Sequence, residues 1–206
     1  MAKAYYEVLF TDTVRALQKE QGTETLYADA MRQHAPTDNR LGPVEKRFIG
    51  QRDGFYQSTV SQSGWPYVQF RGGPRGFLKV LDPQTLGYAD YRGNRQYISD
   101  GNIAADDRMA LILVDYPNSA RLKVLARARL SDDPDLIAQL SDPEYRAKPE
   151  RAVILNVEAF DWNCPQHLPV RLTMEELEPI LAPFQKELSQ LRAENAALRE
   201  KLGDPG

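Results

Sequence analysis

The clearest structural signal in the chain is FYQSTVSQSGWPYVQF, residues 55–70. Its two ends, 55–60 and 65–70, are rich in the aromatic and β-branched residues that favour strands. The polar residues 61–64 between them end in glycine and are typical of a turn. This segment therefore predicts a β-hairpin.

The same arrangement of strand-forming runs and turns continues through the next hundred residues. The further strands predicted in this way are 77–81, 86–91, 109–116, 121–130 and 152–160. The turns between paired runs contain the Pro, Asn, Asp and Ser residues expected there. Seven strands at short spacing predict a closed or nearly closed antiparallel barrel.

Helices are predicted around these strands. Residues 11–52 form a helical lead-in, in which Gly22 and Pro36 separate short segments that begin at Ser/Thr/Asp-type caps or at proline. A further short helix is predicted at 133–140. The expected fold class is therefore mainly β, within the α+β class.

The end of the chain differs in character, and we expect two domains, 1–172 and 173–206. The sequence TMEE at 173–176 is a capping-box motif that begins a helix. Pro179 and Pro183 lack the amide hydrogen that a helix interior needs. They predict a break, with a new helix starting near Pro183.

A heptad repeat follows in the C-terminal segment. It places Leu181, Leu188, Asn195 and Leu202 at a positions and Phe184, Leu191 and Leu198 at d positions. One asparagine among apolar a and d residues favours a parallel two-stranded coiled coil, in which the two Asn195 side chains can pair. Glu187 and Glu194 at g would face Arg192 and Arg199 at e of the partner. We therefore expect a homodimer, the alternative being a helix that folds back on its own domain.

Composition excludes several classes of protein. The 26 Lys and Arg against 29 Asp and Glu give a net charge of −3, so no overall positive charge attracts nucleic acid or an anionic membrane. Cys164, His34 and His167 are too few for a four-ligand metal site. No run approaches the roughly 20 apolar residues of a membrane span, and the first residues lack an apolar signal core. We expect a cytoplasmic protein.

The most unusual feature is a cationic, glycine-rich region, residues 71–79 and 90–96. It holds five cations, Arg71, Arg75, Lys79, Arg92 and Arg95. Arginine offers phosphate a planar fork of donors, and glycine lets backbone amides approach a ligand. The alternative is a charged hairpin surface whose glycines serve the turns.

A second cluster follows the last predicted strand, at residues 161–171. It carries the indole of Trp162, side-chain amides and the guanidinium of Arg171, which together suit a flat heteroaromatic ligand. Alternatively, Trp162 plugs the barrel end and His167 caps the next helix. Ser99 and Asn102 either cap a helix or contact a ligand.

These motifs together resemble the pyridoxamine 5′-phosphate oxidase-like family of flavin-nucleotide-binding proteins. The motifs are GWPY 64–67, RGGP 71–74, GFLK 76–79, GNRQ 93–96, DYP 115–117 and RLK 121–123. The resemblance covers roughly residues 45–172. It implies a split barrel that dimerises and holds FMN at the subunit interface.

The resemblance also implies a cofactor site. Arg75, Lys79 and residues 94–96 would hold the phosphate and ring edge, while Trp162 and Arg171 would reach the flavin from the second subunit. The full set expected to bind FMN is Arg71, Arg75, Phe77, Leu78, Lys79, Asn94, Arg95, Gln96, Ser99, Asn102, Trp162, Gln166 and Arg171.

The expected activity is an FMN-dependent oxidoreduction of a small molecule, with NADH or NADPH as a candidate donor. FMN would carry the chemistry, with the Lys79 charge near the ring. The family's Arg-x-His substrate motif is replaced here by QHLP 166–169, and Leu122 stands where the oxidases have a glutamine. Vitamin B6 is therefore not the expected substrate. The alternative function is a non-catalytic dimer that carries flavin or haem as a sensor or carrier.

Overall fold

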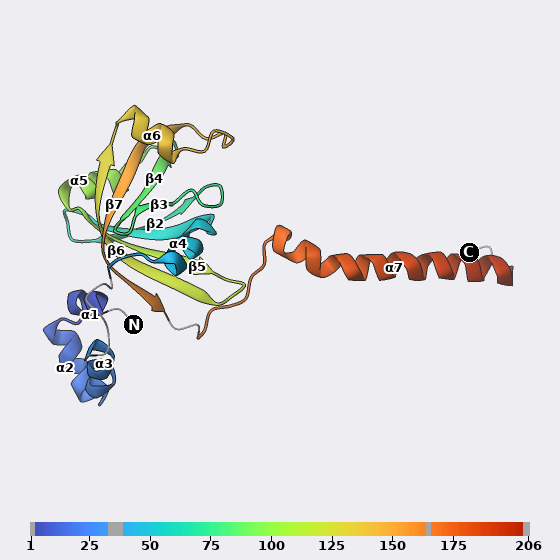
Figure 1. Cartoon of the computed structure of the whole chain (residues 1–206), viewed down its shortest axis with the longest axis horizontal. Coiled ribbons are helices and arrows are strands. Elements are labelled where there is room, and N and C mark those ends of the chain that lie inside the picture. The colour runs from blue at the N-terminus through green and yellow to red at the C-terminus, as the bar shows by residue number, and fades with distance from the viewer. Residues whose placement is uncertain (1–2, 33–38, 164–165, 204–206) are drawn as a thin grey trace. The chain divides into compact units, whose positions relative to one another are not determined.

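The computed structural model describes residues 3–32, 39–163 and 166–203. Its helices are α1 (Lys3–Leu9), α2 (Asp12–Glu20), α3 (Glu24–Arg32), α4 (Pro43–Gly50), α5 (Ile98–Ala105), α6 (Pro134–Leu140) and α7 (Met174–Leu202). Its strands are β1 (Gly54–Val60), β2 (Pro66–Gly72), β3 (Lys79–Asp82), β4 (Thr85–Tyr91), β5 (Arg108–Asp115), β6 (Ala120–Ser131) and β7 (Pro149–Asn163). Figure 1 shows their arrangement. All seven predicted strands are confirmed.

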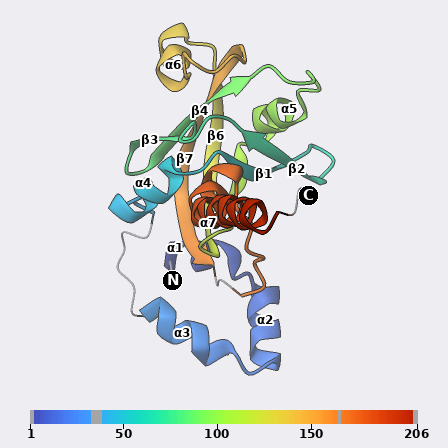
Figure 2. The same ribbon diagram turned by 90° about the vertical axis from the view of Figure 1, so that its right-hand side faces the viewer.

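The strands form one antiparallel sheet in the order β2-β1-β5-β6-β7-β4-β3. The sheet curls around a single large core to which β1, β4, β5, β6 and β7 all contribute (Figures 1 and 2). Strands β2 and β3 are its two edges. This is the expected α+β split barrel.

The core follows from the two-residue period of the strands. In β5 the side chains of Met109, Leu111 and Leu113 are buried and alternate with more exposed neighbours. Strand β4 differs because residues 86–90 are all buried. Its inner face joins the main core, and its outer face packs against Leu140 of α6.

A helical segment outside the predicted lead-in, α1, was missed by the sequence analysis. Its residues Tyr5 and Tyr6 are buried against Ala159 of β7, and Phe10 and Tyr27 complete an aromatic cluster. Burial raises the pKa of Tyr6 to about 12. A seven-residue helix has no strong signal of its own, so the packing of its tyrosines stabilises it.

The predicted break near Pro183 is wrong. Helix α7 is continuous through Pro179 and Pro183, with the predicted capping box at Thr173 and Glu176. Each proline removes one helical hydrogen bond. Because both positions are exposed, water can solvate the freed carbonyl groups, so the helix continues through both prolines.

The chain divides into two compact units. One comprises residues 1–115 and 120–166, and the other comprises 116–119 and 167–206. Across the described ranges, no helix combines the length and hydropathy needed to cross a bilayer. The same residues contain no cluster of three or more His, Cys, Asp or Glu side chains able to hold a metal ion. His34, Pro36 and Cys164 lie outside the described residues.

One glycine of the cationic region is required by the backbone itself. Gly76 has φ of +79°, and a Cβ there would lie 3.0 Å from the carbonyl oxygen of Gly50. We expect Gly76→Ala to lower the free energy of unfolding by about 1–2 kcal/mol, because an L-residue is strained in this conformation. Urea denaturation of the cofactor-free protein measures the change.

Gly93 provides the matched control. A Cβ there would meet nothing within 4 Å, and its φ is not positive. Gly93→Ala should change the stability by less than about 0.5 kcal/mol. Equal effects of the two substitutions would contradict the strain at Gly76.

Candidate functional site

A cavity of about 250 Å³ lies where β2, β4 and the beginning of α5 meet. It brings together five of the predicted cofactor residues, Arg71, Asn94, Arg95, Gln96 and Ser99. Strand β2 supplies Arg71 together with Tyr67 and Gln69, because alternate residues of a strand face the same side.

The loop between β4 and α5 forms one wall of the cavity. Arg95 and Tyr97 have φ of 60° and 51°, in the left-handed region that residues with a side chain seldom adopt. Asn94 Oδ1 accepts a hydrogen bond from the Gln96 amide at 3.2 Å, which supports the bend. Tyr97 is the N-cap of α5 but makes no side-chain capping bond, so the helix start keeps amide donors for another acceptor. Such a wall suits an anion.

Ion pairs neutralise the carboxylates around the cavity. The pairs are Arg71–Asp90 at 2.6 Å, Arg151–Asp100 at 2.9 Å and Arg92–Glu150 at 2.6 Å. Burial raises the pKa of Asp90, and the charge of Arg71 opposes that rise. Among the residues described, Arg95 takes part in no ion pair, and its side chain is exposed. Arg95 is therefore the cavity cation most available to a ligand.

Arg71 offers a second donor at the same place. Its Nη1 is paired with Asp90, but its Nε is buried without a hydrogen-bond partner. A buried donor left unpaired costs free energy, which an added acceptor recovers. The cavity thus has the donors that a phosphate group needs, and the residues present fit a phosphorylated ligand.

A chain of buried hydrogen bonds fixes the cavity floor from behind. Tyr88 Oη donates to Gln57 Oε1 at 2.8 Å, and Gln57 Nε2 donates to Ser99 Oγ at 3.1 Å. Ser99 in turn donates to Gln69 Oε1 at 2.9 Å. Burial raises the pKa of Tyr88, so its hydroxyl remains a donor. Ser99 lies inside α5 rather than at its cap.

Asn102 connects α5 to the sheet. It lies within α5, is buried, and donates from Nδ2 to Thr59 Oγ1 at 2.9 Å. It does not line the cavity. Its described contact attaches α5 to β1.

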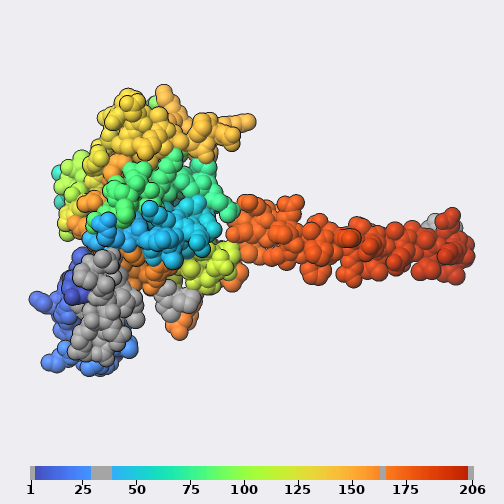
Figure 3. Space-filling model, viewed as in Figure 1, coloured from blue at the N-terminus to red at the C-terminus, as the bar shows by residue number. Residues whose placement is uncertain are grey.

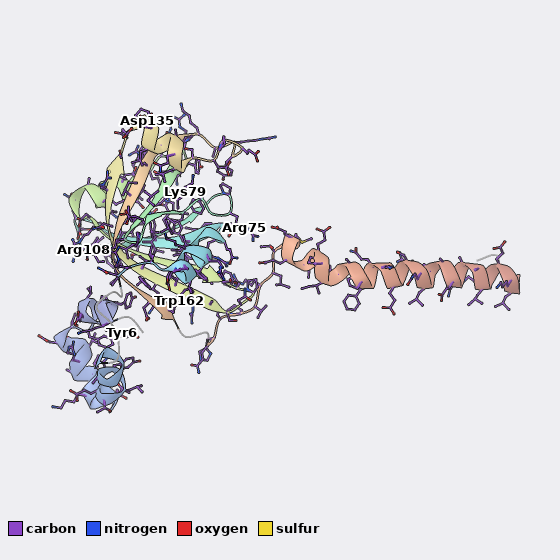
Figure 4. All side chains as sticks on the ribbon, viewed as in Figure 1. Tyr6, Arg75, Lys79, Arg108, Asp135 and Trp162 are labelled. Atoms are coloured by element: carbon purple, nitrogen blue, oxygen red, sulfur yellow. The ribbon has the colours of Figure 1, made fainter. Side chains whose placement is uncertain are left out.

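Arg75 and Lys79 border a second hollow, of about 310 Å³, formed with the segment after α6; Figure 4 labels both. Lys79 Nζ donates to the Gln139 carbonyl at 2.6 Å. Tyr91 links the two hollows, since it lines the first and its hydroxyl accepts from the amide of Asp142 in the second. Within one chain, the predicted phosphate ligands therefore lie at two hollows.

Phe77 and Leu78 belong to the core. Their side chains are 4% and 1% exposed, and Phe77 stacks on Phe55 with ring centroids 5.5 Å apart. In the sequence, Phe77 and Leu78 stand between the cations Arg75 and Lys79. In the fold, the apolar pair turns inward, so its side chains stabilise the barrel.

Two predicted cofactor residues of the 161–171 cluster, Trp162 and Gln166, do not line the first cavity. Trp162, labelled in Figure 4, is half-buried. It donates from Nε1 to Glu45 Oε1 at 2.9 Å and packs edge-to-face on Phe48. The carbonyl of Gln166 accepts from Arg121 at 3.2 Å.

Within the second unit, Arg171 lies over the ring of Tyr116, 4.9 Å from its centroid. His167 has φ of 61° and does not cap the following helix, because Thr173 is the N-cap. The capping interpretation of His167 is therefore wrong.

Sequence reasoning missed several cavity residues. The polar side chains Gln69, Asp90, Asp100 and Glu150 line the cavity but were not selected. Gln69 could have been predicted, because it lies two residues before Arg71 on a predicted strand and alternate residues of a strand face the same side. Glu150 comes from the distant β7, and only the β4–β7 pairing brings it here.

The fold and site define a split-barrel protein with a polar cavity lined by two arginines and three carboxylates. The chain belongs to the pyridoxamine 5′-phosphate oxidase family, whose sequence profile matches residues 43–161. The match covers more than half of the 206 residues. A search of curated proteins found no match.

Solved structures with a similar fold include three from bacteria. A pyridoxamine 5′-phosphate oxidase candidate from Lactobacillus delbrueckii is 29% identical, with 60% of this chain and 94% of that chain covered and a TM-score of 0.46. An FMN-binding protein from Syntrophomonas wolfei is 10% identical, with 71% and 97% covered and a TM-score of 0.47. HupZ from Group A Streptococcus is 14% identical, with 64% and 100% covered and a TM-score of 0.49.

Proposed function

We propose that the protein is a flavoprotein that binds FMN, with the phosphate held at the cavity between β2, β4 and α5. The observation that carries this proposal is the wall formed by residues 94–98. It combines the guanidinium of Arg95, which takes part in no ion pair within the described residues, with the open amide end of α5. Arg71, with its unpartnered Nε, adds a second donor. Membership of a flavin-binding family supports the same ligand.

The size of the cavity favours a site completed by a second copy of the chain. Cofactor pockets commonly span about 300–1,000 Å³ and bury most of the ligand. The cavity of one chain, about 250 Å³, suits the phosphate end better than the whole cofactor. The flavin ring of FMN would need further protein surface, which a second copy of the chain would provide.

An exposed apolar face on the β1–β2 hairpin offers a contact surface for that second copy. Tyr56, Val68 and Phe70 lie on this face, and Trp65 precedes β2. Val68 and Phe70 are 62% and 57% exposed, unusual for apolar residues in the middle of a strand. Tyr67, Gln69 and Arg71 alternate with them toward the cavity. Strand β2 would thus contribute one face to the dimer contact and the other face to the cofactor cavity.

We further propose that the protein is an oxidoreductase acting on a small molecule, with NADH or NADPH as electron donor. Bound FMN would supply hydride and single-electron transfer. Arg95 and Arg71 would anchor the phosphate, and the Ser99–Gln69 hydrogen bond would keep the cavity floor rigid. Lys79 places a positive charge at the neighbouring hollow, where it would favour an anionic form of the ligand ring.

Titration of cofactor-free protein with FMN and with riboflavin tests the binding proposal. We expect FMN to bind about 10- to 100-fold more tightly, because riboflavin lacks the phosphate and its charge-assisted contacts. Quenching of flavin fluorescence measures both affinities. Equal affinities would contradict the proposed phosphate site. If neither FMN nor riboflavin binds, the flavoprotein proposal is overturned.

Anaerobic addition of NADH or NADPH to the FMN-loaded protein tests the activity. Loss of the visible flavin absorbance, and its return with an acceptor, is the expected result. A flavin that stays oxidised with both donors would contradict this choice of donor.

A further inference from the structure

Helix α7 is a complete helix with a well-formed end on each side. Thr173 and Glu176 cap its start reciprocally, and Gly203, with φ of 70°, ends it. At 1.5 Å per residue, its 29 residues span about 44 Å. None of its side chains is buried. Figure 3 shows these side chains standing at the surface along the helix.

The apolar residues of α7 form an uncovered seam. The a and d side chains, with their exposed fractions, are Leu181 38%, Phe184 65%, Leu188 48%, Leu191 54%, Leu198 56% and Leu202 82%. They repeat every three or four residues, so they share one side of the helix. A helix this long keeps such a seam in water at a cost in free energy.

The charges beside the seam cannot be satisfied within the helix. Glu187 and Glu194 at g, and Arg192 and Arg199 at e, have no oppositely charged residue three or four positions away on either side. These are the only spacings at which side chains of one helix meet. These charges are exposed, and a second helix lying along the seam would bring opposite charges beside them.

We propose that α7 pairs in parallel and in register with α7 of a second copy of this chain. In that arrangement each g glutamate lies beside an e arginine of the partner, Glu187 with Arg192 and Glu194 with Arg199. An antiparallel pair sets g beside g and e beside e, which brings like charges together. Asn195 selects the same arrangement, because only in register do two asparagines meet in the seam.

Pairing of α7 would hold two barrel units at a high effective concentration. A linked module meets its partner at roughly millimolar effective concentration, whatever the bulk concentration. This helix pairing does not rest on flavin binding, and its tests use flavin-free protein. Failure of the FMN proposal would leave it standing, and the reverse also holds.

Disulfide cross-linking of the full chain tests orientation and register. Cys164 is the only cysteine, and Cys164→Ser provides a thiol-free background. Leu198→Cys at d should cross-link to itself about tenfold faster than Ala193→Cys at f, because only d side chains approach to disulfide distance. Equal rates would overturn the proposal. So would preferential cross-linking in a mixture of Leu181→Cys and Leu198→Cys chains, because antiparallel pairing sets a residues against d residues and brings these two positions together.

A charge exchange tests the recognition itself. Glu187→Arg with Glu194→Arg makes the charged flanking residues all positive, and Arg192→Glu with Arg199→Glu makes them negative except for Lys201 at the last g position. When these variants also carry Leu198→Cys and Cys164→Ser, each alone should cross-link several-fold more slowly than the parent, and their mixture should form mainly the mixed dimer. A statistical mixture of dimers would show that the flanking charges do not choose the partner.

Discussion

Arg95→Ala is expected to weaken FMN binding by about 10- to 150-fold, the equivalent of one charge-assisted hydrogen bond of about 1.5–3 kcal/mol. Arg95 is the cavity cation that takes part in no ion pair among the described residues, so its guanidinium is the one most available to a phosphate. Titration of the cofactor-free variant, followed by flavin fluorescence, measures the loss. Riboflavin binding should change little, because the missing contact is to phosphate.

Two controls isolate the role of Arg95. Arg129→Ala removes the same charge from an exposed position of β6 that does not line the cavity, and FMN affinity should be retained. Arg95→Lys keeps the charge but loses the planar fork, so an intermediate affinity is expected. If Arg95→Ala binds FMN as the parent does, the phosphate is held elsewhere, and the hollow beside Lys79 becomes the first alternative.

Phe77→Ala should lower the free energy of unfolding by about 3–5 kcal/mol. The ring is 4% exposed, stacks on Phe55 and meets Tyr88 edge-on, so its removal leaves a cavity in the centre of the barrel. Such a loss is a large part of the total stability of about 5–15 kcal/mol of an ordinary domain. Urea denaturation of the cofactor-free protein measures the difference.

Phe77→Leu serves as the comparison, since it keeps most of the buried volume and should cost less than half as much. If Phe77 instead acts mainly on the cofactor, the flavin-free variants would unfold like the parent and only FMN affinity would fall. That outcome would support the role in cofactor binding that the family resemblance implies for Phe77.

The elements that the sequence predicts correctly are those with a local signal. The hairpin at 55–70 and the other strands are confirmed because aromatic and β-branched runs and turn residues each act within a few positions. The capping box at 173–176 is confirmed for the same reason. The predicted break at Pro183 failed because proline only raises the cost of a helix, and an exposed helix can hydrate the affected carbonyl.

The candidate site was less predictable, because it depends on which distant segments meet. Arg71 and Arg75 are four residues apart, yet they line different hollows. Asp90, Asp100 and Glu150 reach the cavity through strand pairing and α5 packing, which no short motif records. Their ion pairs leave Arg95 as the available cation, a result that a count of charges does not give.

By itself, the sequence determined the strands, their turns, the cationic loop and the heptad repeat, because each depends on neighbouring residues alone. Only the tertiary structure decided which residues share a cavity, that Phe77 and Leu78 face the core, and that Trp162 is bound by Glu45. The physical reason is that burial and ion pairing are properties of segments far apart in the chain, and they are set when the sheet curls and closes its core.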